Sequence, residues 1–135
     1  MTTILAHLKL KPGMEGRFEE VGRDMVAQTT GKEPGCIRYE YWRGAEPGQY
    51  YVLLAFRDAR AFYEHQASDW HEDYTPTFRE CYETIRLEVL DPVPGASPLP
   101  STAAQPLADD ASPAVRRHEE TYRIQRQQWW DEAGK

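Results

Sequence analysis

The sequence predicts an α+β domain that ends near residue 91 and is followed by a proline-rich arm. Three observations support this: segments of alternating apolar residues, segments with apolar residues every three or four positions, and an abrupt change of composition. Alternation is typical of a strand with one buried face, and the wider spacing is typical of an amphipathic helix. The chain has 135 residues, which is enough for one domain with its own hydrophobic core.

The first predicted strand and helix occupy the chain up to about Gly31. Residues 3–11 (TILAHLKLK) alternate, which predicts a strand, and the KPG at residues 11–13 predicts a turn. Apolar residues then recur at helical spacing, and they are Met14, Phe18, Val21 and Met25. This stripe predicts an amphipathic helix that ends near Gly31.

Two further alternating segments predict a hairpin. Residues 36–42 (CIRYEYW) and 50–56 (YYVLLAF) alternate, and the residues between them contain Gly and Pro. The last alternating segment, residues 84–90 (TIRLEVL), predicts the strand that closes the domain.

A helical region in two pieces lies between the hairpin and the last strand. We expect a helix over residues 59–67 with Asp58 as its N-cap. A second piece is expected over residues 69–82, where Pro76 should kink or restart it. The resulting order, βαββαβ, is that of the ferredoxin-like split βαβ fold.

The composition changes after the domain, which we place at residues 1–91. Six of the ten prolines lie between residues 91 and 113, and proline cannot sit inside a helix or donate to a strand ladder. We therefore predict a proline-rich linker over residues 92–113. Residues 114–135 contain many Arg, Glu and Gln, and Ser112 with Pro113 is a helix-start signal, so we predict a C-terminal helical arm.

The overall charge argues against two classes of partner. The formal net charge is −6 at pH 7, whereas binding to nucleic acid or to an anionic membrane needs a basic surface. No apolar run approaches the roughly 20 residues that span a bilayer. We expect a cytoplasmic protein that binds neither nucleic acid nor membrane.

The histidine-rich segment at residues 64–74 (EHQASDWHEDY) does not predict a metal site. His65 and His71 are six residues apart, which is about 120° around a helix, so one helix cannot aim both at one ion. The segment HEDYT resembles the start of an HExxH motif, but Thr75 stands where the second His is needed. There is also no GxGxxG motif and no phosphate loop. We expect no metal and no cofactor.

Three blocks of sequence resemble the antibiotic-biosynthesis monooxygenase family over residues 1–91. They are AHLKLKPGMEGRFEE, EPGCIRYEYWR and FRDARAFYEHQASDWHEDY. The resemblance implies a dimeric α+β barrel, that is, a homodimer whose sheets pack face to face, with a pocket between sheet and helices in each protomer. The family includes cofactor-free oxygenases of anthrones and quinols as well as haem-degrading enzymes, so fold alone does not define the chemistry.

The haem-degrading branch of the family does not fit this chain. Its members carry an Asn on the first strand, a Trp on the second helix and an axial His further along. The corresponding positions here are Ala6, His65 and either Tyr74 or Thr75. Haem degradation is therefore not expected.

Strand parity, helix spacing and the resemblance together indicate an aromatic pocket suited to a flat hydrophobic ligand. The residues expected to bind such a substrate are Tyr39, Tyr41, Phe56, Phe62, Trp70, Tyr74 and Phe78. The alternative interpretation is that these aromatic side chains only fill the core.

His65 is the one candidate catalytic residue. It shares a helix face with Phe62, so it should point into the pocket. An imidazole has an ordinary pKa of about 6.5 and can take a proton from a phenol or quinol near neutrality. The alternative is a buried histidine with a structural hydrogen bond. His71 lies off the predicted Trp70–Tyr74–Phe78 stripe, so we expect it on the helix surface or the pocket rim.

These observations lead to a function hypothesis with two alternatives. The leading hypothesis is a cofactor-independent monooxygenase acting on a quinol, an anthrone or a similar hydrophobic, polyketide-like aromatic molecule. The alternatives are a non-catalytic dimeric binding module for a hydrophobic ligand, and a lyase, isomerase or cyclase that uses the same pocket.

The uncovered face of the predicted sheet indicates self-association. Helices should cover one face only, and the opposite face carries Leu5, His7, Trp42, Leu53 and Leu90. An apolar patch of this kind usually marks an interface, so we expect a homodimer. We also expect the C-terminal helix to dock on the dimer near a pocket mouth, through Trp129 and Trp130.

Overall fold

The computed structural model describes residues 1–133 and has the predicted βαββαβ order. The strands are β1 (Thr2–Leu10), β2 (Cys36–Arg43), β3 (Gln49–Phe56) and β4 (Tyr82–Leu90). The helices of the domain are α1 (Glu15–Lys32), α2 (Ala59–Gln66) and α3 (Asp69–Cys81). All four strands belong to one antiparallel sheet with the order β2-β3-β1-β4, so the ferredoxin-like α+β fold is confirmed.

The sheet register decides which side chains face the helices. Ala6 pairs with Val52 on β3 and with Leu87 on β4, and these residues all point to the helix side. A bulge between Cys36 and Arg38 interrupts the expected alternation on β2. As a result Ile37 leaves the ladder and is 48% exposed, although the sequence pattern had grouped it with Tyr39 and Tyr41.

The two helical pieces after β3 are separated by a capped break. The Asp58 carboxylate accepts from the Ala61 N–H (2.8 Å), and the Ser68 hydroxyl accepts from the His71 N–H (3.3 Å). α3 then runs on both sides of Pro76 as one helix, so of the expected kink or restart at Pro76 the restart does not occur. The chain turns instead at Ala67 and Ser68, because Ser68 caps the start of α3.

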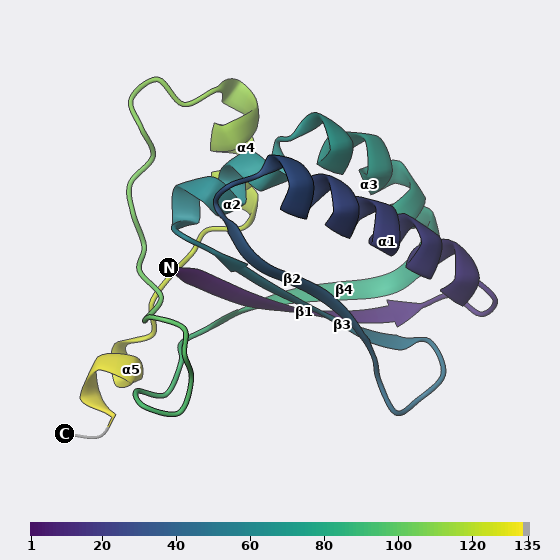
Figure 1. Cartoon of the computed structure of the whole chain (residues 1–135), viewed down its shortest axis with the longest axis horizontal. Coiled ribbons are helices and arrows are strands. Elements are labelled where there is room, and N and C mark those ends of the chain that lie inside the picture. Colours follow the sequence, from purple (N-terminus) through teal and green to yellow (C-terminus); the bar gives the residue numbers. More distant parts are fainter. Residues whose placement is uncertain (134–135) are drawn as a thin grey trace.

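Helices α1 and α3 lie side by side over one face of the sheet (Figure 1). α1 lies close to β2 at Gly22. A Cβ atom added to this glycine would lie only 3.0 Å from the Tyr41 ring. The fully buried side chains at the centre of this layer include Ile4, Phe18, Met25, Phe56 and Phe62. The opposite face of the sheet carries no helix of the domain (Figure 1).

The arm after β4 is not one helix. It forms α4 (Pro113–Thr121) and α5 (Gln128–Glu132), separated by extended residues, so the predicted continuous helix over residues 114–135 is wrong over its middle. Gly134 and Lys135 of the predicted arm lie outside the described residues. The arm passes along the end of the sheet near the N-terminus and brings α4 beside α2 (Figure 1).

Hydrogen bonds fasten the linker part of the arm to the end of the sheet. The Thr102 hydroxyl donates to the Leu90 carbonyl (2.7 Å) and accepts from the Thr3 N–H (3.3 Å). The Ala103 N–H donates to the Met1 carbonyl (3.0 Å). Thr102 is fully buried by these contacts, so the linker is packed against the domain rather than separate from it.

Within the protomer, the residue that packs the end of the arm against the domain is Ile124, whereas the expected docking of Trp129 and Trp130 on a dimer stays a prediction. Ile124 is 4% exposed, and its N–H donates to the Tyr63 hydroxyl (2.8 Å). Trp129 is 64% exposed, and Trp130 lies against the Arg126 guanidinium at 5.7 Å. The arm thus packs on its own protomer through an aliphatic residue that composition alone did not distinguish.

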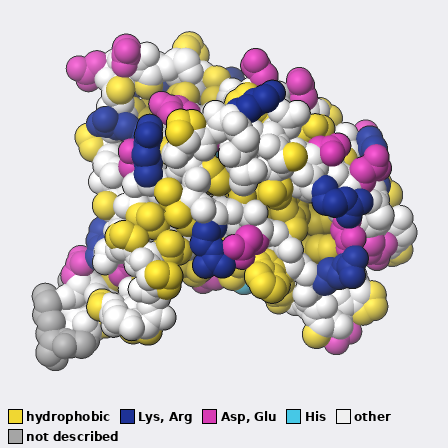
Figure 2. Space-filling model, in the orientation of Figure 1, with side chains coloured by type: hydrophobic (Ala, Val, Ile, Leu, Met, Phe, Trp, Pro, Cys, Tyr) yellow, Lys and Arg dark blue, Asp and Glu magenta, His cyan; other side chains and the backbone are white. Residues whose placement is uncertain are grey.

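The surface in Figure 2 carries hydrophobic side chains among charged ones. Within residues 1–133, no helix combines the length and the apolar character needed to cross a bilayer.

We expect the Ile124→Ala substitution to destabilise the protein by about 2–4 kcal/mol, because it empties a buried site between α2 and β4. Trp129→Ala is the matched control from the same arm, and it should change the free energy of unfolding by less than about 0.5 kcal/mol. Urea denaturation of both variants measures the difference. Equal effects from the two substitutions would contradict the docking of the arm through Ile124.

Candidate functional site

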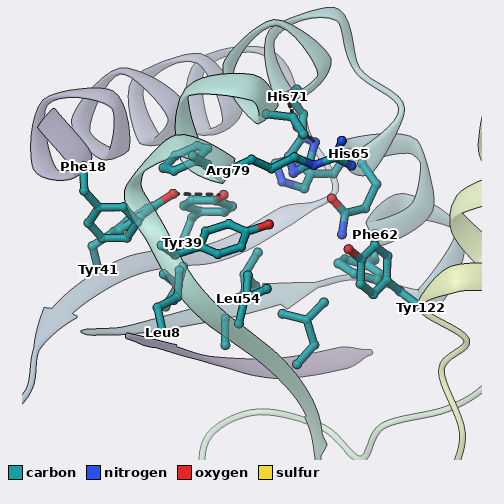
Figure 3. Close-up of a pocket in the computed structure, with 18 residues that line it drawn as sticks. Leu8, Phe18, Tyr39, Tyr41, Leu54, Phe62, His65, His71, Arg79 and Tyr122 are labelled. Atoms are coloured by element: carbon teal, nitrogen blue, oxygen red, sulfur yellow. Dashed lines mark hydrogen bonds between the residues drawn. The ribbon is translucent and has the colours of Figure 1, made fainter. Parts of the chain in front are cut away.

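A pocket lies between the helix-facing side of the sheet, the helices α2 and α3, and the arm (Figure 3). Its volume is about 120 Å³. Leu8 and Leu54 form its apolar floor, while His65, His71 and Arg79 lie across from them. The arm contributes Tyr122, which lies next to Phe62 in Figure 3. Polar groups therefore converge on one side of a mainly apolar space, as in many small-molecule sites.

One end of the pocket is a cluster of aromatic rings. The Phe18 and Tyr41 rings meet edge to face at 5.6 Å, and Tyr41 stacks on Phe78 at 6.4 Å. The hydroxyls of Tyr39 and Tyr41 are 3.5 Å apart (dashed line in Figure 3). Burial raises the pKa of both phenols well above the usual value, so they remain neutral and can donate hydrogen bonds.

His65 is fixed by a carboxylate that the sequence analysis did not identify. Its Nδ1 lies 3.0 Å from Glu33 Oε2 and 3.2 Å from Glu33 Oε1. The Trp70 indole N–H also donates to Glu33 Oε2, at 2.7 Å. Glu33 follows the last residue of α1, so this carboxylate links the end of α1 with both α2 and α3.

The hydrogen bond to Glu33 determines the tautomer of His65. A carboxylate accepts hydrogen bonds, so Nδ1 of His65 carries the proton and donates it to Glu33. In the neutral ring the lone pair is then on Nε2. His65 is 1% exposed, and its Nε2 has no hydrogen-bond partner among residues 1–133. His65 thus lines the pocket with a buried, unprotonated imidazole nitrogen that has no partner among the described residues.

His71 lies beside His65 in the wall. The two ring centroids are 4.9 Å apart, and the hydroxyl of Thr75 lies 3.4 Å from His71 Nδ1. Burial is the largest cause that lowers the pKa of His71, and together with the neighbouring His65 and His118 it brings this pKa to about 3. His71 is therefore neutral at physiological pH.

A third histidine extends this row into the arm. The His118 ring is 6.5 Å from the His71 ring, and its Nε2 donates to Glu72 Oε1 at 2.8 Å. Glu72 also lies 3.5 Å from the Arg117 guanidinium. Two side chains of α4, His118 and Arg117, thus contact the Glu72 carboxylate of α3 and hold α4 beside the pocket.

The structure places most, but not all, of the expected residues at the pocket. The residues that line it as expected are Tyr39, Tyr41, Phe62, His65 and Phe78. Three expected ligand contacts are not part of the lining. Phe56 is fully buried behind the His65 ring, Trp70 turns toward Glu33 and Lys32, and Tyr74 packs against the core from another side of α3.

His71 lines the pocket and is partly exposed, which agrees with the pocket rim and not with the helix surface, the two positions expected for it. The reason is the phase of α3. Ser68 caps α3 and so sets the residue at which the helix begins. From that start, His71, Thr75 and Phe78 fall on the face of the helix that lies at the pocket. The stripe assumed from the sequence was displaced by one residue along the start of this helix.

Sequence reasoning missed Glu33, Arg79 and Tyr122. Glu33 belongs to the EPG turn and comes within reach of His65 only when α1 and α2 pack together. Arg79 is one charged residue among many on an exposed helix face. No spacing in the sequence links these positions to His65. Within the part of the chain that the structure describes, no three His, Cys, Asp or Glu side chains are placed to hold a metal ion.

The pKa of His71 predicts a contribution to acid sensitivity. Its native pKa is about 3 and its ordinary value is 6.5, so between these values the unfolded chain binds a proton that the native protein does not. His71 therefore lowers stability progressively as the pH falls from about 6.5 toward 3. His71→Gln should flatten the pH dependence of the unfolding free energy, measured with urea between pH 7 and pH 4. Parallel curves for the two proteins would contradict this expectation.

Comparisons with known proteins agree with this architecture. A protein from Caulobacter crescentus, whose name proposes antibiotic biosynthesis monooxygenase activity, is 29% identical with a TM-score of 0.63, over 68% of this chain and 89% of its own. A Shewanella oneidensis protein is 27% identical with a TM-score of 0.61, over 66% of this chain and 87% of its own. A Mycobacterium tuberculosis protein shares the fold with a TM-score of 0.64 at 23% identity, over 71% of this chain and 98% of its own.

A comparison with curated proteins gave no match. The family model for antibiotic biosynthesis monooxygenase matches residues 1–83, which contain the first three strands and the helices α1 to α3. The chain therefore belongs to the antibiotic biosynthesis monooxygenase family.

Proposed function

We propose that this protein is a cofactor-independent monooxygenase of a quinol, an anthrone or a related hydrophobic aromatic molecule. Family membership supports oxygenase chemistry, and the aromatic pocket supports a flat substrate. The observation that carries the proposal is the free Nε2 of His65, which is held in a basic tautomer by Glu33. Such a site can generate an electron-rich substrate anion without a metal or an organic cofactor.

The proposed reaction begins with proton transfer. For an anthrone, Nε2 of His65 takes a proton from the methylene carbon, and the resulting carbanion is delocalised over the rings. One electron passes from this anion to O₂, and the substrate radical and superoxide combine to form a C–O bond. The His65 imidazolium returns its proton to the peroxide. Loss of the second methylene proton with cleavage of the O–O bond gives a quinone carbonyl and one molecule of water.

Other groups of the wall would stabilise the substrate anion. Arg79 lines the pocket, and no carboxylate of residues 1–133 lies within 4.0 Å of its guanidinium. A cation without a protein counter-ion favours a negatively charged ligand. The neutral phenols of Tyr39 and Tyr41 can donate hydrogen bonds to a substrate oxygen. In this proposal Glu33 is a positioning residue and His65 is the catalytic base.

We expect His65→Ala to lower the rate of anthrone oxidation by about 10²–10⁴-fold, the usual contribution of a general base. Glu33→Gln should lower the rate while leaving substrate affinity nearly unchanged, because the amide can turn its N–H toward Nδ1 and favour the wrong tautomer. Oxygen uptake measures the rate, and thermal melting tests whether each variant is folded.

Glu64→Gln is the control for the loss of a carboxylate, since Glu64 is exposed and adjacent to His65 in sequence. It should keep the wild-type rate. A folded His65→Ala protein with full activity would remove His65 from the mechanism. If activity fell only in proportion to the folded fraction, the structural role of a buried histidine would be the better explanation.

The same free base also supports a second candidate reaction. Proton abstraction next to a carbonyl, without oxygen transfer, is the chemistry of an isomerase, a cyclase or a lyase. Product formation under strictly anaerobic conditions would favour this alternative over the oxygenase. Stoichiometric ligand binding with no turnover in air would favour a binding module.

We further propose that the protein works as a homodimer through the uncovered face of the sheet. Leu5 on β1 lies opposite Leu53 on β3, and both are half-buried on this face. Trp42 on the edge strand β2 is 55% exposed. Exposed apolar area of this kind is normally covered by a partner, and in family members the sheets pack face to face.

Sedimentation equilibrium should therefore detect a dimer at micromolar concentration. Leu53→Asp places a charge at the centre of the proposed interface and should produce monomers. Val93→Asp, at a position in the arm that is 68% exposed, is the control and should remain dimeric. A monomeric wild-type protein would contradict the proposal.

A further inference from the structure

One wall of the pocket comes from outside the matched family domain. The family match ends at residue 83, and the structural neighbours cited above cover 66–71% of this chain. Tyr122 belongs to the arm, yet it lines the same pocket as His65 and lies beside Phe62 (Figure 3). The arm is thus an added segment that contributes to the site of the domain.

The position of Tyr122 is fixed on both sides along the chain. Two residues later, Ile124 is buried and its N–H donates to the Tyr63 hydroxyl at 2.8 Å. Four residues earlier, His118 donates to Glu72 on α3 at 2.8 Å. Tyr122 itself ends α4, where its N–H donates to the His118 carbonyl at 2.8 Å. The backbone of this residue is therefore held at the pocket even though its side chain is 37% exposed.

The size of the pocket conflicts with a ligand of several rings. Its volume is about 120 Å³. An apolar cavity of about 150 Å³ holds a benzene molecule, and pockets for larger ligands measure roughly 300 Å³ or more. A compound with two or three fused rings therefore has to displace part of the wall.

The aromatic walls differ in how easily they can be displaced. Phe62 is 1% exposed and Tyr39 is 8% exposed, and both pack in the core of the domain. Moving either one would leave a void in a close-packed interior. Tyr122 has solvent on one side, so its ring can rotate outward at little cost. Two other lining residues are also exposed and can move as easily: Ile85 on β4, at 42%, and Arg79 on α3.

We propose that Tyr122 is a specificity-determining residue that limits how many fused rings the pocket accepts. Its ring closes the pocket at the end near Phe62, so a one-ring ligand, which needs little more than the present volume, displaces this ring least and a larger ligand has to push it further aside. The inference rests on the proposed function for the class of ligand, a flat hydrophobic phenol, but it does not require that the ligand be oxidised.

Binding of a matched series of phenols tests the inference. Phenol, 1-naphthol and 9-phenanthrol have one, two and three fused rings and one hydroxyl each, and calorimetry under anaerobic conditions separates binding from oxygenation. Tyr122→Ala should lower the dissociation constant of 9-phenanthrol by about tenfold and change that of phenol by less than about twofold. This is the scale on which pockets discriminate ligands by size. 1-Naphthol should fall between them.

Three further variants isolate the cause. Tyr122→Phe keeps the ring and should retain the wild-type preference, because the inference assigns the effect to ring volume rather than to the hydroxyl. Trp129→Ala removes an exposed aromatic residue of the same arm and should leave all three affinities unchanged. Ile85→Ala should change the three affinities but keep the wild-type order in which phenol, 1-naphthol and 9-phenanthrol bind.

The outcomes separate this inference from the proposed function. An equal change for all three ligands in Tyr122→Ala, or no change, would overturn the role of Tyr122. If Ile85→Ala, and not Tyr122→Ala, changed the affinity more for ligands with more rings, Ile85 on β4 would limit ligand size. That result would also overturn the role of Tyr122. Failure of the wild-type protein to bind any of the phenols would overturn both proposals. Size-dependent binding combined with no oxygen uptake on anthrones would overturn only the oxygenase.

Discussion

The carboxylate of Glu33, whose side chain is 13% exposed, is the interaction on which the arrangement of the helices around the pocket depends. It accepts hydrogen bonds from His65 on α2 and from Trp70 on α3, and it follows directly on the end of α1. A carboxylate removed from water is costly unless its oxygens are paired, so the three helices are stable only in positions that keep both donors in reach. The orientation of the imidazole is therefore a consequence of how the helices pack.

This constraint also separates the properties of the three histidines. His65 has a carboxylate on one nitrogen, and its other nitrogen is buried at the pocket wall without a hydrogen-bond partner among residues 1–133. His71 is surrounded by apolar groups and by two other histidines, and burial with these neighbours lowers its pKa to about 3. His118 faces the Glu72 carboxylate near the surface. Of these three histidines, His65 is the one that lines the pocket and has a carboxylate to orient its ring, which is why it is the proposed base.

The sequence predicted the fold well because the signals for it are local. Each signal comes from a single strand or helix that has one buried face and one exposed face. Examples are the alternation along residues 3–11 and 84–90 and the stripe from Phe18 to Met25. The site was predicted less completely because it depends on tertiary packing. The Glu33–His65 contact joins residues that are 32 positions apart, and the position of His71 depends on which residue caps α3. The contact of the arm with its own protomer was not predicted because Ile124 is one small aliphatic residue in a polar segment, and no pattern distinguishes the residue that fits the site beside Tyr63.

The position of that site explains why an added arm reaches the pocket at all. α2 has only eight residues, and the helix-facing side of β4 beyond it presents Leu87 and Val89. These side chains would be open to water if the chain ended after β4, and apolar area of this kind favours a covering segment. Residues 121–124 lie over them and bring Tyr122 to the border of the cavity. The same burial that stabilises the arm therefore places Tyr122 at the candidate site, so the specificity proposed for this residue would come from the arm and not from a change in the family domain.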